Sequence, residues 1–193
     1  MDGIPKTEMQ FLLLLLKSPG QDFNANSISK GLKISPMGAL NIAGNLVKQG
    51  IISSKEMGRA KFFSICFNKD YANQYLKFLL MREAEQAPSY VRMWINEVRT
   101  LKNAELAIIF GSVLEKQEKA NDIDVLLVTR QNEFAGLKKE IERINAVNSK
   151  KLHPVYVDAD IYSRSLKGGA ILDAIKGIVA FGEDKFIKLI KRN

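Results

Sequence analysis

Apolar positions follow a helical period in the first part of the chain, and the segment 36–49 shows it most clearly. Its apolar stripe, at spacings of three, three and one, consists of Leu40, Ala43, Leu46 and Val47. Before it, Ser35 is a good N-cap and Pro36 suits the first helical position. After it, Gly50 suits the C-terminal stop. The pattern therefore predicts an amphipathic helix with one buried face.

Further elements surround this helix. An apolar helix is predicted over 7–17, and a short helix, capped by Asn26 or Ser27, over 26–31. After the main helix, the letters IISSKE and AKFFSICF predict two strands joined across 57–59. The expected order is helix, helix, turn, helix and basic hairpin.

This order resembles the winged helix-turn-helix DNA-binding domains of archaeal and bacterial transcription regulators, over about residues 5–67. The resemblance implies that 36–49 is a recognition helix that enters the major groove of double-stranded DNA. Asn41 would read adenine, and basic side chains would contact phosphates. The residues expected to face DNA are Lys33, Met37, Asn41, Lys48, Lys55, Arg59 and Lys61. The alternative is a winged helix that docks a protein, with these cations as solvated surface.

Beyond a break at 87–89, strand and helix patterns alternate. The expected strands are 106–110, 123–129, 152–157 and 178–181, and the expected helices are 132–145, 158–166, 171–176 and a last one from Glu183. This order predicts a mixed sheet covered by helices, and so an α+β protein with domains 1–86 and 87–193.

Apolar residues also recur at coiled-coil-like spacing just after the break, at Val91, Trp94, Val98 and Leu101. One interpretation is a helix packed on its own domain. The other is a homodimer contact, which would suit paired DNA half-sites.

Composition narrows the class of protein. With 193 residues and 46% hydrophobic positions, the chain is long and apolar enough for a substantial core. No leader pattern opens it, and the longest apolar run, 11–16, is too short for a bilayer, so we expect a cytoplasmic protein without a membrane partner. The single cysteine, Cys66, excludes an internal disulfide. A formal charge of +8 points to a polyanionic partner such as nucleic acid.

The stretch IIFGSVLEKQEKANDIDVLLV, residues 108–128, carries the candidate chemistry. Asp122 and Asp124 flank one isoleucine, so in a strand both carboxylates share a face with Cβ atoms roughly 7 Å apart. Gly111 allows close backbone approach, and Ser112 offers a hydroxyl and an N–H to a phosphate. Two adjacent carboxylates beside such a turn predict a Mg²⁺ site that also holds substrate phosphates. The alternative is a pair of aspartates that caps a helix or forms salt bridges near Lys116 and Lys119.

Gly-Ser followed by Asp-hydrophobic-Asp on a strand resembles the DNA polymerase β-type nucleotidyltransferase superfamily, and more narrowly its minimal nucleotidyltransferases, over about residues 90–190. The resemblance implies that Gly111 and Ser112 bind a nucleoside triphosphate, most simply ATP, and that Asp122 and Asp124 bind Mg²⁺ as catalytic residues. A third catalytic carboxylate normally comes from a later strand. Here the matching strand, LHPVYV, contains His153 and no acid.

The nearest acids are Asp158 and Asp160, just past that strand, and Asp158 is the candidate third catalytic residue. The alternatives are that Asp158 is the N-cap of the next helix and that His153 replaces the base in a modified site. Two functions stay open. One is transfer of a nucleoside monophosphate to a hydroxyl of a protein or nucleic acid, in one form as an antitoxin that modifies a toxin-like partner. The other is transcriptional regulation, in which an inactive nucleotidyltransferase-like domain senses nucleotide or mediates assembly.

Overall fold

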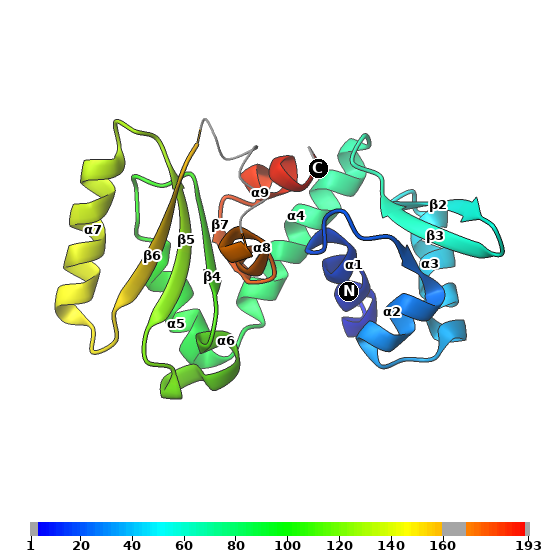
Figure 1. Cartoon of the computed structure of the whole chain (residues 1–193), viewed down its shortest axis with the longest axis horizontal. Helices are drawn as coiled ribbons and strands as arrows, with labels where there is room; N and C mark the ends of the chain where they lie inside the picture. Colours follow the sequence, from blue (N-terminus) through cyan, green and yellow to red (C-terminus); the bar gives the residue numbers. More distant parts are fainter. Residues whose placement is uncertain (1–3, 160–168, 192–193) are drawn as a thin grey trace. The chain divides into compact units, whose positions relative to one another are not determined.

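The computed structural model describes residues 4–159 and 169–191, and the chain divides into two compact units. Unit 1 is Met1–Leu79 with Asn193, and unit 2 is Leu80–Arg192. The division falls inside helix α4 (Asp70–Glu85), before the predicted break at 87–89 (Figure 1). The reason lies in packing: Tyr75 in the first half of α4 donates a hydrogen bond to Glu8 of unit 1, whereas Ala84 in the second half belongs to the core of unit 2.

Unit 1 contains the predicted series of helices followed by a hairpin. Its elements are α1 (Lys6–Leu16), β1 (Phe23–Asn24), α2 (Ala25–Leu32), α3 (Pro36–Lys48), β2 (Ile52–Met57) and β3 (Ala60–Ile65). The strands form an antiparallel sheet in the order β1-β3-β2. The predicted order of helices and hairpin is thus confirmed, and β1 is an addition, since a two-residue strand leaves no alternation to detect.

Helix α2 begins earlier than predicted. Asn24, not Asn26 or Ser27, is its N-cap: the Asn24 side chain accepts a hydrogen bond from the backbone N–H of Ser27 at 3.0 Å. The Ser27 hydroxyl in turn accepts one from the N–H of Asn24 at 2.9 Å. This reciprocal capping box fixes the start of the helix next to β1.

The core of unit 1 comes from α1 and the elements around it. Phe11, Leu12 and Leu16 are fully buried, as are Ile28 of α2 and Leu46 of α3. These residues lie at helical spacing, so burial of one apolar stripe per helix holds the unit together. Within the described ranges, every helix is too short or too polar to serve as a bilayer-crossing segment.

Unit 2 is built around a four-stranded mixed sheet in the order β6-β5-β4-β7. Strands β5 and β6 are parallel, and the other neighbours are antiparallel, which confirms the predicted mixed sheet. Besides the end of α4, its elements are α5 (Ser89–Val98), β4 (Leu106–Phe110), α6 (Val113–Lys116), the 3-10 turn Gln117–Lys119, β5 (Ile123–Thr129), α7 (Phe134–Val147), β6 (Leu152–Asp158), α8 (Gly169–Ile175), β7 (Ile178–Phe181) and α9 (Glu183–Lys191). The helix predicted over 158–166 is replaced at its start by the end of β6, and 160–166 lies outside the described residues.

The seam predicted along 91–101 packs within its own unit. Val91, Trp94, Val98 and Leu101 are all buried in one cluster with side chains of β4, β5 and α7. This burial agrees with the interpretation that the helix packs on its own domain. Helices α8 and α9 contact β4 as well.

Candidate functional site

Helix α3 is held at both ends by local signals. The Ser35 hydroxyl accepts a hydrogen bond from the N–H of Gly38 at 3.0 Å, Pro36 occupies the first turn, and Gly50 follows the helix with φ +72°. Its buried residues are Ala39, Ala43 and Leu46. The predicted stripe was partly wrong, because Leu40 and Val47 are 41% and 36% exposed. The inward face follows the spacing 39, 43 and 46, and this rotates both residues toward solvent.

The outer face of α3 mixes apolar and amide side chains with one charge. Its exposed residues are Met37, Leu40, Asn41, Gly44, Asn45, Val47 and Lys48. Met37 is 64% exposed and lies at the first turn, whereas Lys48 closes the helix. Both Met37 and Asn41 are thus placed where the predicted recognition helix requires them, on the solvent side.

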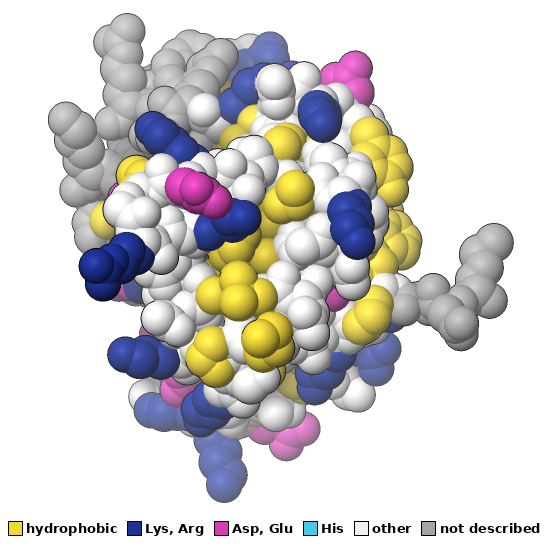
Figure 2. Space-filling view, turned by 90° about the vertical axis from the view of Figure 1, so that its right-hand side faces the viewer, with side chains coloured by type: hydrophobic (Ala, Val, Ile, Leu, Met, Phe, Trp, Pro, Cys, Tyr) yellow, Lys and Arg dark blue, Asp and Glu magenta, His cyan; other side chains and the backbone are white. Residues whose placement is uncertain are grey.

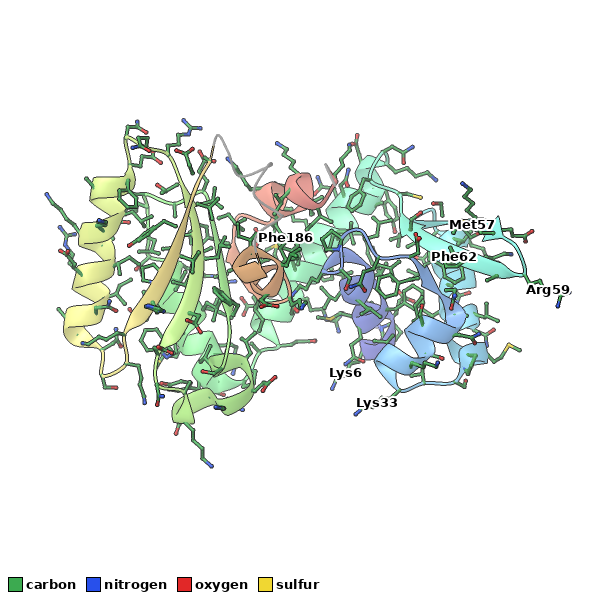
Figure 3. The ribbon with its side chains drawn as sticks, viewed as in Figure 1. Lys6, Lys33, Met57, Arg59, Phe62 and Phe186 are labelled. Atoms are coloured by element: carbon green, nitrogen blue, oxygen red, sulfur yellow. The ribbon has the colours of Figure 1, made fainter. Side chains whose placement is uncertain are left out.

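Basic side chains surround this region of unit 1. Lys33 follows α2 in the left-handed conformation with φ 55°, and Lys55 lies on β2. Arg59 stands at the hairpin tip and projects outward (Figure 3), and Lys61 lies 3.6 Å from Glu56 in an exposed pair. On the side where Figure 1 draws α2, α3 and the hairpin, hydrophobic side chains gather in the middle and Lys and Arg side chains lie around them (Figure 2). All seven residues expected to face DNA are exposed.

In unit 2, three strands bring the candidate cation ligands together. Phe110 at the end of β4 pairs with Asp124 on β5, and Asp124 pairs with His153 on β6. Ligand atoms of Asp122, Asp124 and His153 all lie within 4.8 Å of one another. The Nδ1 atom of His153 is 3.4 Å from Oδ1 of Asp124. The structure thus adds a histidine to the predicted aspartate pair.

Gly111 packs directly against this cluster. Its φ is +77°, and a Cβ on it would lie 2.2 Å from Oδ2 of Asp124, so a larger residue would displace that carboxylate. Ser112 follows at the start of α6; its side chain makes no cap hydrogen bond, and its carbonyl accepts the N–H of Lys116 at 2.8 Å. The predicted Gly-Ser turn therefore lies beside the aspartates, as the resemblance implied.

A groove of about 410 Å³ opens at the same turn. Its polar lining includes Ser112 and Glu115 on one side and, from α8 and the residue after it, Asp173 and Lys176, whose side chains are 3.1 Å apart. The sequence pattern does not point to Lys176, because the place of this residue depends on the pairing of β7 with β4 far along the chain. A Cβ on Gly177 would lie 2.3 Å from the carbonyl oxygen of Ile109, so this segment lies tightly against β4.

The alternative of aspartates sealed by lysines does not describe this cluster. Across residues 4–159 and 169–191, no ion pair joins Lys116 or Lys119 to Asp122 or Asp124. The Asp124 side chain keeps 27% of its surface exposed and that of His153 keeps 73%. The cluster is therefore open to a solute.

Asp158 lies elsewhere. It ends β6 and pairs with Thr129 at the end of β5, whereas the cluster lies at the start of both strands. Five residues of strand separate Asp158 from His153, about 17 Å at the usual rise. The expectation that Asp158 supplies a third carboxylate at this cluster was therefore wrong, because the parallel register puts His153 at that level instead. Asp160 lies outside the described residues.

The three candidate ligands combine oxygen and nitrogen donors, so they suit a divalent cation that accepts both. Carboxylate oxygens suit Mg²⁺ and Mn²⁺, whereas an imidazole nitrogen suits transition metals. Two carboxylates and one imidazole within 4.8 Å can supply three ligands on one side of an ion. The remaining positions would be left for water or for oxygens of a phosphate.

No protein-family model matches this chain, and a search of curated proteins finds no match. Among solved structures, a single-site mutant of Lactococcus lactis ZitR is 24% identical, covers 37% of this chain and 47% of its own length, and has a TM-score of 0.31. The adhesin competence repressor of Streptococcus pyogenes is 17% identical over 51% of this chain and 69% of its own, with a TM-score of 0.38. Wild-type ZitR in complex with DNA is 17% identical over 52% of this chain and 74% of its own, with a TM-score of 0.31. The chain thus spans less than half of the first of these structures.

Proposed function

We propose that this protein is a DNA-binding regulator whose unit 2 holds a divalent cation together with a nucleoside triphosphate. The observation that supports the DNA-binding part is the exposed outer face of α3 within a basic unit. Residues 1–79 contain ten Lys or Arg against five Asp or Glu. A helix of this kind fits the major groove of duplex DNA, and the surrounding cations would neutralise backbone phosphates.

The two kinds of side chain would have different tasks. Lys33, Lys48, Lys55, Arg59 and Lys61 would contact phosphates and fix the position of the protein on the duplex. Residues of α3 would face base edges and supply the sequence preference. The hairpin tip, where Arg59 projects, would follow the neighbouring backbone.

Titration of a labelled genomic duplex by fluorescence anisotropy, from 50 to 200 mM salt, tests the DNA-binding part. We expect affinity to fall steeply with salt, and the double variant Arg59→Ala, Lys61→Ala to reduce the slope by about two, one phosphate contact per cation. A matched control removes one lysine and one arginine from exposed positions of α7, Lys139→Ala and Arg143→Ala, and should leave the slope unchanged. Absence of binding at 50 mM salt would contradict the proposal.

Nucleotidyl transfer is the second candidate function, and the cluster of Asp122, Asp124 and His153 beside the Gly111 turn supports it. In that reaction a hydroxyl oxygen of the acceptor loses its proton to solvent and bonds to the α-phosphorus of the triphosphate, the bond to the bridging oxygen breaks, and pyrophosphate leaves. Asp122, Asp124 and His153 would hold the cation, which when bound withdraws charge from phosphate oxygens. Gly111 and Ser112 would hold the phosphate tail through backbone N–H groups.

Incubation with ATP labelled on the α-phosphate, in Mg²⁺ or in Mn²⁺, separates an enzyme from a nucleotide sensor. Acceptors would be the chain itself, duplex DNA and a protein partner recovered with it. Label transferred by the wild type and lost in Asp122→Ala supports the enzyme. Nucleotide bound without transfer supports the regulator with an inactive domain, and no nucleotide binding contradicts this part of the proposal.

A further inference from the structure

The chemistry of the outer face of α3 is selective in a way that the proposed DNA binding does not require. The helix carries no arginine and no acidic residue, and its one charged residue, Lys48, stands at its last position. Bidentate arginine or lysine is the commonest reader of guanine. The base-facing positions of α3 therefore hold none of the usual guanine contacts.

Two asparagines lie on this face instead. Asn41 and Asn45 are four positions apart, so their side chains lie on one side of the helix on successive turns. Both are exposed, and within the described ranges neither side-chain amide has a hydrogen-bond partner. An asparagine amide matches the N6 and N7 atoms of adenine in the major groove.

Apolar groups accompany the asparagines. Met37 and Leu40 are 64% and 41% exposed on the same helix. The thymine methyl group is the apolar feature of the major groove and pairs with apolar side chains. Asparagine for adenine and an apolar side chain for thymine together match one kind of base pair.

Gly44 is a second, independent observation on this face. Glycine in the middle of a helix destabilises it relative to alanine, and a Cβ at Gly44 would meet no atom within 4 Å. The fold therefore gives no reason for the glycine. Binding does give a reason. Without a side chain at Gly44, the exposed face has a gap between Leu40 and Val47, through which another molecule can approach the helix backbone closely.

We infer that α3 recognises A·T base pairs in the major groove, with Asn41 and Asn45 reading adenine, Met37 and Leu40 touching thymine methyls, and Gly44 admitting the DNA. The inference rests on the proposed DNA binding and names its target. Duplex DNA fits this face better than an apolar protein surface does, because Asn41 and Asn45 interrupt the apolar positions of α3. Lys and Arg side chains also lie around the hydrophobic ones on this side of the molecule (Figure 2). Nothing on this part of α3 would repel a phosphate backbone.

Two duplexes of equal length, one of A·T pairs in mixed order and one of G·C pairs, test the inference at a single salt concentration. We expect the A·T duplex to bind about 100-fold more tightly, about tenfold for each asparagine contact. Asn41→Ala and Asn45→Ala should each weaken A·T binding by about tenfold and leave G·C binding unchanged. Lys48→Ala is the matched control in the same helix, and it should weaken binding to both duplexes by the same factor.

Gly44→Ala provides a readout in which stability and binding move in opposite directions. We expect the thermal midpoint to rise by about 4 °C, while A·T binding falls several-fold. If Gly44→Ala binds the A·T duplex as tightly as the wild type does, DNA does not approach the helix backbone closely at this position. Equal affinity for the two duplexes would overturn A·T recognition and leave DNA binding standing. Binding to neither would overturn both and assign the α3 face to a protein partner.

Discussion

The two candidate sites are built in opposite ways. The α3 face consists of neighbouring residues on one helix. Because Ala39, Ala43 and Leu46 are buried, the helical period places the residues of this face on the solvent side. The cation cluster takes residues from β5 and β6 and packs against the end of β4, and it exists only because two strand registers agree. The first kind of site follows from local signals, and the second follows from the whole sheet.

This difference predicts different sensitivities. A change on the outside of α3 alters what the helix contacts without disturbing the fold. A change at the Gly111 turn alters both, because the backbone of one strand lies against the carboxylate of the next. Variants of each kind, ordered below by expected effect, therefore test whether the two sites are independent.

Loss of a cation ligand should have the largest effect. In Asp124→Asn the cluster keeps its shape but loses a charge, and we expect the affinity for Mn²⁺, measured by electron paramagnetic resonance, to fall about 100-fold. Asp173→Asn removes the same charge from the neighbouring groove and should leave Mn²⁺ affinity nearly unchanged. DNA binding should not respond to either variant. Equal Mn²⁺ affinity in Asp124→Asn and the wild type would show that this cluster does not bind the cation.

The next largest effects are expected at two glycines that share a positive φ but have different surroundings. Gly111 and Gly58 have φ values of +77° and +62°, but only at Gly111 would a Cβ collide, with the Asp124 carboxylate. We expect Gly58→Ala to lower the free energy of unfolding by about 1 kcal/mol through backbone strain alone. Gly111→Ala should lower it by about 3 kcal/mol, because the carboxylate must also move. Chemical denaturation measures both, and equal losses would show that the close approach is relaxed in solution.

The smallest expected effect is at the start of α3. Ser35→Ala removes the hydrogen bond that the Gly38 N–H donates at 3.0 Å, and we expect a loss of about 1 kcal/mol in the free energy of unfolding. Ser35→Asp restores an acceptor and should recover most of it. If Ser35→Ala is as stable as the wild type, the cap contributes nothing to the stability of α3.

Much of the local structure could be predicted from the sequence. Ser35, Pro36 and Gly50 mark the ends of α3 because caps are short-range features, and the aspartate pair follows from the two-residue period of a strand. The orientation of α3 was predicted only in part: Ala43 and Leu46 are buried as expected, but Leu40 and Val47 lie on the exposed face. An apolar residue next to a buried stripe fits either side of the helix until the neighbouring elements are known.

Long-range features of the second site could not be predicted in this way. The choice of Asp158 over His153 depended on the register of two parallel strands joined by a helix, which no local signal fixes. Lys176 reaches the Gly-Ser groove through the pairing of β7 with β4. Only the chemistry of the motif, Gly111 beside Asp124, pointed to the correct edge of the sheet.

Nuclear magnetic resonance of the uniformly ¹⁵N-labelled chain tests most directly the claim that unit 1 binds DNA while unit 2 holds a cation. An A·T duplex is added first and Mn²⁺ second to the same sample. We expect DNA to shift the amide signals of α3 and of the hairpin around Arg59, and Mn²⁺ then to broaden those of Gly111, Asp124 and His153. Signals of α3 that stay unmoved at saturating duplex, or broadening spread evenly over the exposed carboxylates of the chain, would contradict this claim.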